Sequence, residues 1–390
     1  MKKQIHLPQP FEYPHRIEIS KGDGCFLYDQ KGKSYIDFVS NVGVNNLGYN
    51  SIAIKKAITK QAGILTNATF SHIGTKDQEE LIAMLCKFCG KEFDTGYYAA
   101  TGSDAVETAV RIAVAKKGKK GKIIALKPGY HGATLGTAFL TSEDMPIKTL
   151  FNAPYKVLRA NYATNEKETS KCLKALEVML KSNKDIAAWI IEPILGSAGY
   201  VVPAKNFIVG IRKLCNKYNI PLIADEVQSG NFRSGRFLAI ENFNVKPDII
   251  CLGKSVGAGL PLGIVITSKR FRLKHHHYPT SAGANLLAIA AAKASLKYIQ
   301  AKKLDKNAAE IGDYIKERLA KMSVDNVRGL GLLVGFDLKS SKQANSTISS
   351  ARKNGLLLMK GGKKSIRLCP PLIISKNIAK KAMDILEKSI

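Results

Sequence analysis

Long apolar runs are absent from this 390-residue chain, and the absence excludes several classes of protein. No segment approaches the length that a membrane-spanning helix needs, and the opening MKKQIHLPQPF lacks the apolar core of a signal peptide. Hydrophobic residues make up 45% of the chain and charged residues 23%, proportions that are typical of a soluble globular protein. We therefore expect a cytoplasmic protein.

Cysteine is sparse, and its spacing shows no disulfide framework. Seven cysteines occur, and Cys86 and Cys89 form a lone CxxC inside an apparent amphipathic helix. No second pair completes a zinc site there, and His275–His277 have no carboxylate or cysteine beside them. We interpret the cysteines as thiols in a reducing compartment, and the histidines as part of a loop. The sequence predicts no metal site.

Acidic residues are also few, so the chain is strongly basic. Sixty Lys and Arg residues against 31 Asp and Glu give a formal net charge of +29. Nucleic acid or an anionic membrane surface would be attracted by such a charge. Binders of this kind concentrate their charge and interleave aromatics, whereas the densest run here, Lys116–Lys122, is short. We interpret the charge as solvated surface and expect no dedicated nucleic-acid or membrane partner.

Strand-like and helix-like segments alternate from about Tyr97 to Ile266. This alternation indicates an α/β fold with a mostly parallel sheet that is covered by helices on both faces. The chain is too long for one simple core, so we expect two domains. We predict a strand meander at 1–50 that joins the small domain, a large α/β domain at 51–280 and a small α+β domain at 281–390.

Three ionisable residues follow apolar runs that read as buried strands. They are Glu192, Asp225 and Lys254. Ligands collect at the carboxyl ends of strands in open α/β sheets, so these side chains are candidates for one site. Lys254 stands in a glycine-rich turn and is a candidate Schiff-base nucleophile. The plainer alternative is a surface lysine in a loop.

Two further turns suit a flat, anionic ligand. In TGSDAVE, Gly102 and Ser103 open a helix whose backbone N–H groups are free to bind phosphate, and we expect Asp104 and Glu107 to cap its first turn. In PGYHGAT, an aromatic beside a histidine follows another strand, and Tyr130 is placed to stack on a heterocycle. Each turn also suits an ordinary strand–helix connection.

Six ordered motifs resemble those of the class III aminotransferases of fold type I. They are TGSDAVE, YHG, IIEP, the IADEVQSG segment with its RSGR, PDIICLGKSVGAGLPLG and IRLCPPL, and the similarity covers nearly the whole chain. The resemblance implies a pyridoxal 5′-phosphate enzyme with a seven-stranded sheet. Such an enzyme moves an amino group from an amino acid or ω-amino compound to a 2-oxo acid in a ping-pong cycle.

The resemblance also implies roles for single residues. Lys254 matches the lysine of the internal aldimine, and Asp225 matches the carboxylate that pairs with the pyridine nitrogen. Seven further positions are implied for the cofactor. Gly102 and Ser103 form the phosphate turn, Tyr130 is the stacking aromatic and His131 follows it. Glu192 is the Glu-Pro glutamate, Gln228 lies near the phenolic oxygen and Thr280 is a phosphate-binding threonine. The neighbouring subunit supplies that threonine, which implies a homodimer with shared sites.

Substrate binding is implied for Arg367 and Val42. Arg367 matches the arginine that holds a substrate carboxylate through a bidentate fork. Two departures from the family affect it. Ala133 replaces an arginine that acetylornithine and 4-aminobutyrate enzymes carry, and Ser197 replaces a glutamate that pairs with the C-terminal arginine. We therefore expect a permanently available Arg367 and a preference for α-amino acids, or for substrates whose single carboxylate binds in one mode.

Two alternatives remain open at this point. Some members of the family are amino-acid racemases with loops related to PTSAGANLLAIAAAKASL, although the sequence identifies no second acid–base group opposite Lys254. A nucleic-acid-binding protein on a degenerate enzyme fold would also explain the basic charge, but every cofactor position is filled by a competent residue. The donor, the acceptor, the pathway and any assembly beyond a dimer are open.

Overall fold

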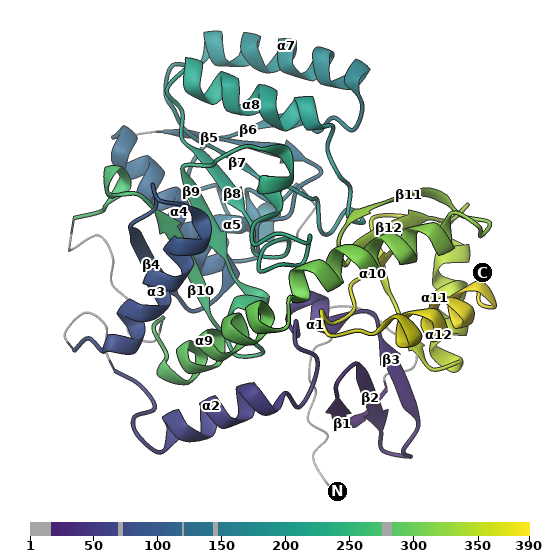
Figure 1. The fold of residues 1–390 in the computed structure, drawn as a ribbon. Coiled ribbons are helices and arrows are strands. Elements are labelled where there is room, and N and C mark those ends of the chain that lie inside the picture. The colour runs from purple at the N-terminus through teal and green to yellow at the C-terminus, as the bar shows by residue number, and fades with distance from the viewer. Residues whose placement is uncertain (1–16, 69–72, 119–120, 143–146, 275–282) are drawn as a thin grey trace, which may run out of the picture.

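The computed structural model describes residues 17–68, 73–118, 121–142, 147–274 and 283–390. Its centre is a seven-stranded sheet with the order β4-β10-β9-β8-β7-β5-β6 (Figure 1). The strands are β4 (Thr95–Ala99), β5 (Lys122–Lys127), β6 (Val157–Asn161), β7 (Ile186–Ile191), β8 (Leu222–Asp225), β9 (Ile249–Leu252) and β10 (Gly263–Thr267). Of these strands only β10 runs in the opposite direction to the rest, so the expected α/β fold with a mostly parallel sheet is confirmed.

Both faces of this sheet are buried, because successive side chains enter two different apolar cores. In β5, Ile123 and Ala125 pack into one core, and Ile124 and Leu126 pack into the other. Helix α4 contacts strands on the first side, and α7 and α8 lie together across the second (Figure 1). The helices of this part are α2 (Ile52–Ala62), α3 (Lys76–Cys89), α4 (Gly102–Lys117), α5 (Leu135–Ala138), α6 (Ile147–Leu150), α7 (Glu166–Ser182), α8 (Lys205–Lys217) and α9 (Leu286–Ala301).

The first and last parts of the chain form two smaller sheets, and strands from both parts pair in the first of them. One has the order β1-β2-β3-β13 and the other β11-β12-β15-β14. Their strands are β1 (Ile19–Asp23), β2 (Phe26–Asp29), β3 (Ser34–Asp37), β11 (Asp325–Leu330), β12 (Leu333–Asp337), β13 (Leu356–Leu357), β14 (Met359–Gly361) and β15 (Ser365–Leu368). Helices α10 (Leu304–Leu319), α11 (Ser341–Lys353) and α12 (Lys376–Glu387) pack on them. The domain boundaries after residues 50 and 280 stay predictions.

Short helical turns complete the described chain. The turns are α1 (Ser40–Gly43), η1 (Ala239–Phe243), η2 (Lys254–Gly257) and η3 (Lys269–Phe271). Among the described helices, none combines the length and apolar character needed to cross a bilayer.

The parallel strands deliver the predicted residues to one edge. Strand β8 ends at Asp225, and β7 and β9 end just before Glu192 and Lys254. Parallel pairing joins β7 to β8 and β8 to β9, with Asp225 opposite Cys251. Their carboxyl ends therefore open on the same side of the sheet.

Candidate active site

Lys254 opens the turn η2 in a left-handed backbone conformation, with φ of 46°. Its pKa is lowered, chiefly because the ammonium is withdrawn from water, and the positive charge of Arg367 acts in the same direction. The carboxylates of Asp225 and Glu192 oppose this shift. A lysine in this setting holds more free amine at neutral pH than an exposed lysine, which is what a nucleophile and proton carrier requires.

Asp225 is buried at the end of β8 and bonds to His131. The distance between Asp225 Oδ2 and His131 Nδ1 is 2.8 Å, and both side chains are almost completely buried. An ionised carboxylate only accepts hydrogen bonds, so it favours the tautomer in which Nδ1–H of His131 donates. Asp225 Oδ1 also accepts the Val227 N–H at 3.2 Å. These contacts hold a negative charge at a fixed place on the sheet edge.

Glu192 joins two loops at the same edge. Its Oε1 accepts the Tyr130 N–H at 2.7 Å, and its Oε2 accepts the Gly196 N–H at 2.9 Å. Burial raises the pKa of this carboxyl to about 7, and the negative charge of Asp225 adds to the rise, while His131 and the two N–H donors oppose it. Glu192 therefore fixes the backbone of the loop that carries Tyr130.

The predicted phosphate turn lies against the turn that carries the lysine. A Cβ added to Gly253 would stand 2.9 Å from the Gly102 Cα, so glycine is required for this close approach. Gly132 of the PGYHGAT loop also approaches the start of α4, since a Cβ added to Gly132 would stand 2.4 Å from Ser103 Oγ. The N-terminus of α4, the strand end before Lys254 and the PGYHGAT loop thus converge.

The capping of α4 differs from the expectation in one residue. Thr101 is the N-cap, because its Oγ1 accepts the Asp104 N–H at 3.2 Å, and Asp104 accepts the Ala100 N–H at 2.8 Å. Glu107 does not cap the helix. Its carboxylate accepts hydrogen bonds from the Thr134 hydroxyl and from the Gly136 N–H. Glu107 is too far along the helix to reach the free N–H groups and instead anchors the PGYHGAT loop.

Gly196 is the meeting point of the remaining predicted residues. A Cβ on Gly196 would overlap Gln228 Oε1 at 1.8 Å, and Gln228 Nε2 donates to the Val42 carbonyl at 3.1 Å. Arg367 Nη1 donates to the Gly196 carbonyl at 3.2 Å, and its Nε donates to the Lys360 carbonyl at 3.0 Å. The cofactor and substrate positions implied by the resemblance, apart from Thr280, therefore lie in one connected region.

Two residues in this region were not predicted from the sequence. The Tyr200 side chain is fully buried, and the Arg367 guanidinium lies over its ring, 5.8 Å from the centroid. Cys369 is fully buried and follows Arg367 by two positions. Residues two apart in an extended segment share a face, so Cys369 was recognisable from spacing, whereas nothing local marks Tyr200.

Nine of the ten cofactor- and substrate-binding positions other than Lys254 lie in the described chain and meet at this edge. The tenth, Thr280, lies outside the described residues, as do His275–His277. The roles of all these residues stay predictions.

Glu226, beside Asp225 in sequence, is a buried acid with a testable pH dependence. Its carboxylate accepts hydrogen bonds from the Ser229 hydroxyl and the Ile240 N–H. Burial raises its pKa from 4.5 to about 7. A raised carboxyl pKa stabilises the fold at low pH, and this contribution is lost as pH rises through 7.

We therefore expect Glu226→Gln to equal the parent near pH 4, below the unfolded pKa of 4.5, and to exceed it near pH 8 by up to roughly 3 kcal/mol in unfolding free energy. Urea unfolding at the two pH values measures this. Glu177→Gln, which removes the surface partner of Lys217, is the control and must lack the gain. An equal effect of Glu226→Gln at both pH values would contradict the assignment.

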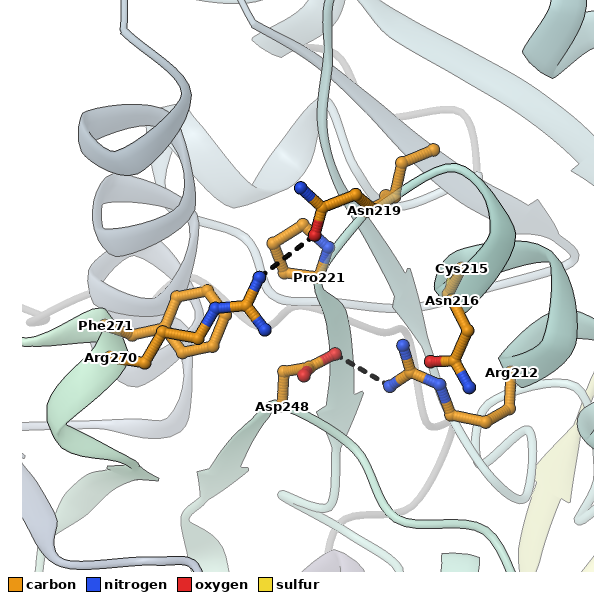
Figure 2. Close-up of a pocket in the computed structure, with 9 residues that line it drawn as sticks. Arg212, Cys215, Asn216, Asn219, Pro221, Asp248, Arg270 and Phe271 are labelled. Carbon is orange, nitrogen blue, oxygen red and sulfur yellow. Dashed lines mark hydrogen bonds and ion pairs between the residues drawn. The ribbon is translucent and has the colours of Figure 1, made fainter.

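A hollow of about 170 Å³ lies away from this site, near the amino ends of β8 and β9 (Figure 2). Its charged groups already have hydrogen-bond partners in the protein. Asp248 accepts Arg212 Nη1 at 2.7 Å and the Leu222 N–H at 2.8 Å, and Arg270 donates to Asn219 at 3.0 Å. We interpret these contacts as structural interactions that fix the starts of the two strands.

Comparison with known proteins identifies the family. A sequence model described as Aminotransferase class-III matches residues 9–390. The chain is 30% identical over 387 residues to the acetylornithine aminotransferase of Archaeoglobus fulgidus, covering 99% of this chain and 98% of that protein. It is 31% identical over 382 residues to that of Bacillus cereus, covering 96% and 95%.

Solved structures agree with the sequence matches. An amine transaminase from an uncultivated Pseudomonas species, in its PLP-bound form, superposes with a TM-score of 0.92 at 26% identity, covering 100% of this chain and 99% of that one. The ornithine aminotransferase of Toxoplasma gondii superposes with a TM-score of 0.89 at 27% identity, covering 98% and 92%. Because the family match spans almost the entire sequence, we conclude that this protein belongs to the class III aminotransferases.

Proposed function

We propose that this aminotransferase takes its amino group from a donor whose carboxylate is bound by Arg367. The class III family transfers amino groups to 2-oxo acids and uses pyridoxal 5′-phosphate as cofactor. The proposal rests on the interactions of the Arg367 guanidinium. Among the described residues no carboxylate forms an ion pair with its guanidinium, which is oriented by two main-chain carbonyls and the Tyr200 ring. A substrate carboxylate would be its ionic partner.

The residues present fit this cofactor. The glycine contact between Gly102 and Gly253 leaves the start of α4 open to a phosphate group, with Ser103 beside it. The buried Asp225 carboxylate would face the ring nitrogen, and Tyr130 would stack on the ring. Gln228 has a second N–H, besides the one given to Val42, that would reach the phenolic oxygen.

Asp225 and Lys254 would have separate roles in the reaction. When bound, the cofactor withdraws electrons from the substrate's α-carbon. Asp225 would keep a proton on the ring nitrogen, because its anion is buried and fixed by His131. Lys254 Nζ would hold the cofactor and would move the proton at the substrate's α-carbon, because its lowered pKa favours the free amine. Arg367 would hold the substrate so that its α-carbon lies in position for this proton transfer.

Two positions, Ala133 and Ser197, depart from the motifs that the family resemblance implies for acetylornithine enzymes. Ala133 is exposed on the PGYHGAT loop and offers no cation for a second carboxylate. Ser197 stands beside Gly196, where a glutamate would be able to neutralise Arg367. We therefore propose α-amino acids, or compounds with a single carboxylate bound in one mode, as donors. Assaying α-amino acids, N-acetylornithine, diamines and 4-aminobutyrate with 2-oxoglutarate and pyruvate tests this, and efficient use of 4-aminobutyrate would contradict it.

Restoring the missing glutamate gives a directed prediction. In Ser197→Glu, the new carboxylate is expected to pair with Arg367 and to raise the KM for an α-amino acid donor about tenfold or more, with a smaller change in kcat, because it competes with the substrate carboxylate. Ala198→Glu places the same charge one residue further on and is the matched control. Equal KM changes in both variants would mean that the position of the charge is irrelevant.

The finer assignments are also proposals. A cytoplasmic homodimer with shared sites agrees with the family resemblance, and sedimentation at several protein concentrations tests the dimer. Racemisation is not favoured by the relatives, which are aminotransferases. Incubating one L-amino acid without a 2-oxo acid and finding the D-enantiomer would revive it.

A further inference from the structure

The turn α1 has an unusual backbone. Ser40, Asn41, Val42 and Gly43 follow one another with φ values of 48°, 50°, 59° and 84°. Side chains other than glycine are unfavourable in this left-handed region, and a β-branched residue such as Val42 is the least suited to it. A run of this kind persists only where its surroundings hold it, and such runs concentrate at functional sites.

Asp37, the last residue of β3, holds this turn. Its Oδ1 accepts the Val39 N–H at 2.8 Å and the Ser40 N–H at 3.0 Å. Its Oδ2 accepts the Tyr49 hydroxyl at 2.7 Å. The side chain is 1% exposed, so these bonds are shielded from competing water. Burial raises the pKa of this carboxyl above its usual value, while the three hydrogen bonds and the positive charge of the fully buried Arg233 guanidinium oppose the rise.

The far end of the turn contacts the candidate active site. The Val42 carbonyl accepts Gln228 Nε2, and a Cβ on Gly43 would lie 3.9 Å from that same amide nitrogen and 3.6 Å from Cys369 Sγ. Gln228 Oε1 in turn abuts Gly196. A continuous path of contacts therefore leads from the Asp37 carboxylate through the turn to the Gln228 amide.

We propose that Asp37 is a positioning residue for the reaction: it holds the left-handed turn Ser40–Gly43 in the conformation that fixes the Gln228 amide at the cofactor. The inference rests on the proposed function in one respect, namely that Gln228 contacts the cofactor. Asp37 itself touches neither substrate nor cofactor, so its effect must pass through the turn and Gln228.

Asp37→Asn is the direct test, because it keeps the shape of the side chain and removes its charge. Two measurements on the purified holoenzyme are needed, the pH titration of the cofactor's visible absorbance and the steady-state kinetics of transamination. We expect the titration midpoint to move by about half a pH unit or more. We expect kcat/KM for the donor to fall roughly 10- to 100-fold, as is usual when a positioning contact is lost. Tyr49→Phe, which removes one of the bonds to Asp37, is expected to shift both in the same direction by less.

The matched control is Asp29→Asn. Asp29 is also at the end of a strand, and it accepts the Lys31 and Lys33 N–H groups and the Tyr35 hydroxyl, but it anchors an exposed turn away from the site. Asp29→Asn therefore measures the effect of losing a similar carboxylate that holds a turn in the same strand meander. If the absorbance and kinetics of Asp37→Asn match those of Asp29→Asn, the inference is overturned.

Gln228→Ala separates this inference from its premise. A shifted absorbance in Gln228→Ala with an unchanged one in Asp37→Asn would overturn the role of Asp37 alone. An unchanged absorbance in Gln228→Ala would show that Gln228 does not contact the cofactor, and the inference would then be overturned as well. If Asp37→Asn does not fold, Tyr49→Phe decides the question, and an absorbance titration and kcat/KM equal to those of the parent overturn the proposal.

Discussion

Lys254→Ala is expected to lower the rate of transamination by roughly 10⁴-fold or more, because one side chain serves as nucleophile and as proton carrier. The variant is expected to fold, since alanine fills the same left-handed position at no greater backbone cost than lysine. It should also still bind the cofactor through the glycine turn at Gly102 and the carboxylate of Asp225. The cofactor should, however, be removable by gel filtration, because no covalent link holds it.

Two controls give this result its meaning. Lys122→Ala removes a lysine at the other edge of the sheet, where it pairs with Asp185 at 2.9 Å, and should leave the activity unchanged. Adding a small primary amine to Lys254→Ala should restore part of the rate, because the amine is able to enter the space and carry the proton. An active Lys254→Ala enzyme with a tightly held cofactor would contradict the assignment of this lysine.

The part of the site that lies on the sheet was predictable for a physical reason. A buried parallel strand is a run of apolar residues, so the first ionisable residue after the run marks its carboxyl end. Glu192, Asp225 and Lys254 all meet this description, and parallel pairing of β7, β8 and β9 then brings them to one edge.

The loops were predictable only in part. The positive φ values of Ser40–Gly43 depend on the distant carboxylate of Asp37, and no local pattern in SNVG marks a left-handed run. Glu107 has the spacing of a capping residue, yet the hydroxyl of Thr134 is a nearer donor than the helix N–H groups. In both cases contacts between segments far apart in sequence decide the local structure. Substrate preference depends on such contacts around Arg367, which is why the donor has to be found by assay.

Asp225→Ala is the second variant with a large expected effect. Without the buried carboxylate, nothing of comparable charge would keep a proton on the ring nitrogen, and we expect kcat to fall roughly 10³-fold, the size of effect seen when a preorganised charge partner is removed from an active site. The raised pKa of Glu192 should fall as well, since the Asp225 charge is one of its causes. Asp248→Asn is the matched control, because Asp248 accepts bonds from Arg212 and from Leu222 in the same sheet, away from the site.

A cofactor analogue makes the cause testable. Pyridoxal phosphate methylated on its ring nitrogen carries a permanent positive charge, and Asp225→Ala leaves room for the methyl group. If the role of Asp225 is to keep the ring nitrogen charged, the analogue should restore a large share of kcat to Asp225→Ala, and it should bring no gain to the parent enzyme, where the carboxylate occupies that space. If the analogue binds but restores nothing, the loss in Asp225→Ala comes from His131, whose Nδ1 would have lost its hydrogen bond to Asp225 and with it the orientation of the PGYHGAT loop. The two explanations predict opposite outcomes, so the analogue decides whether Asp225 acts on the cofactor or on the loop.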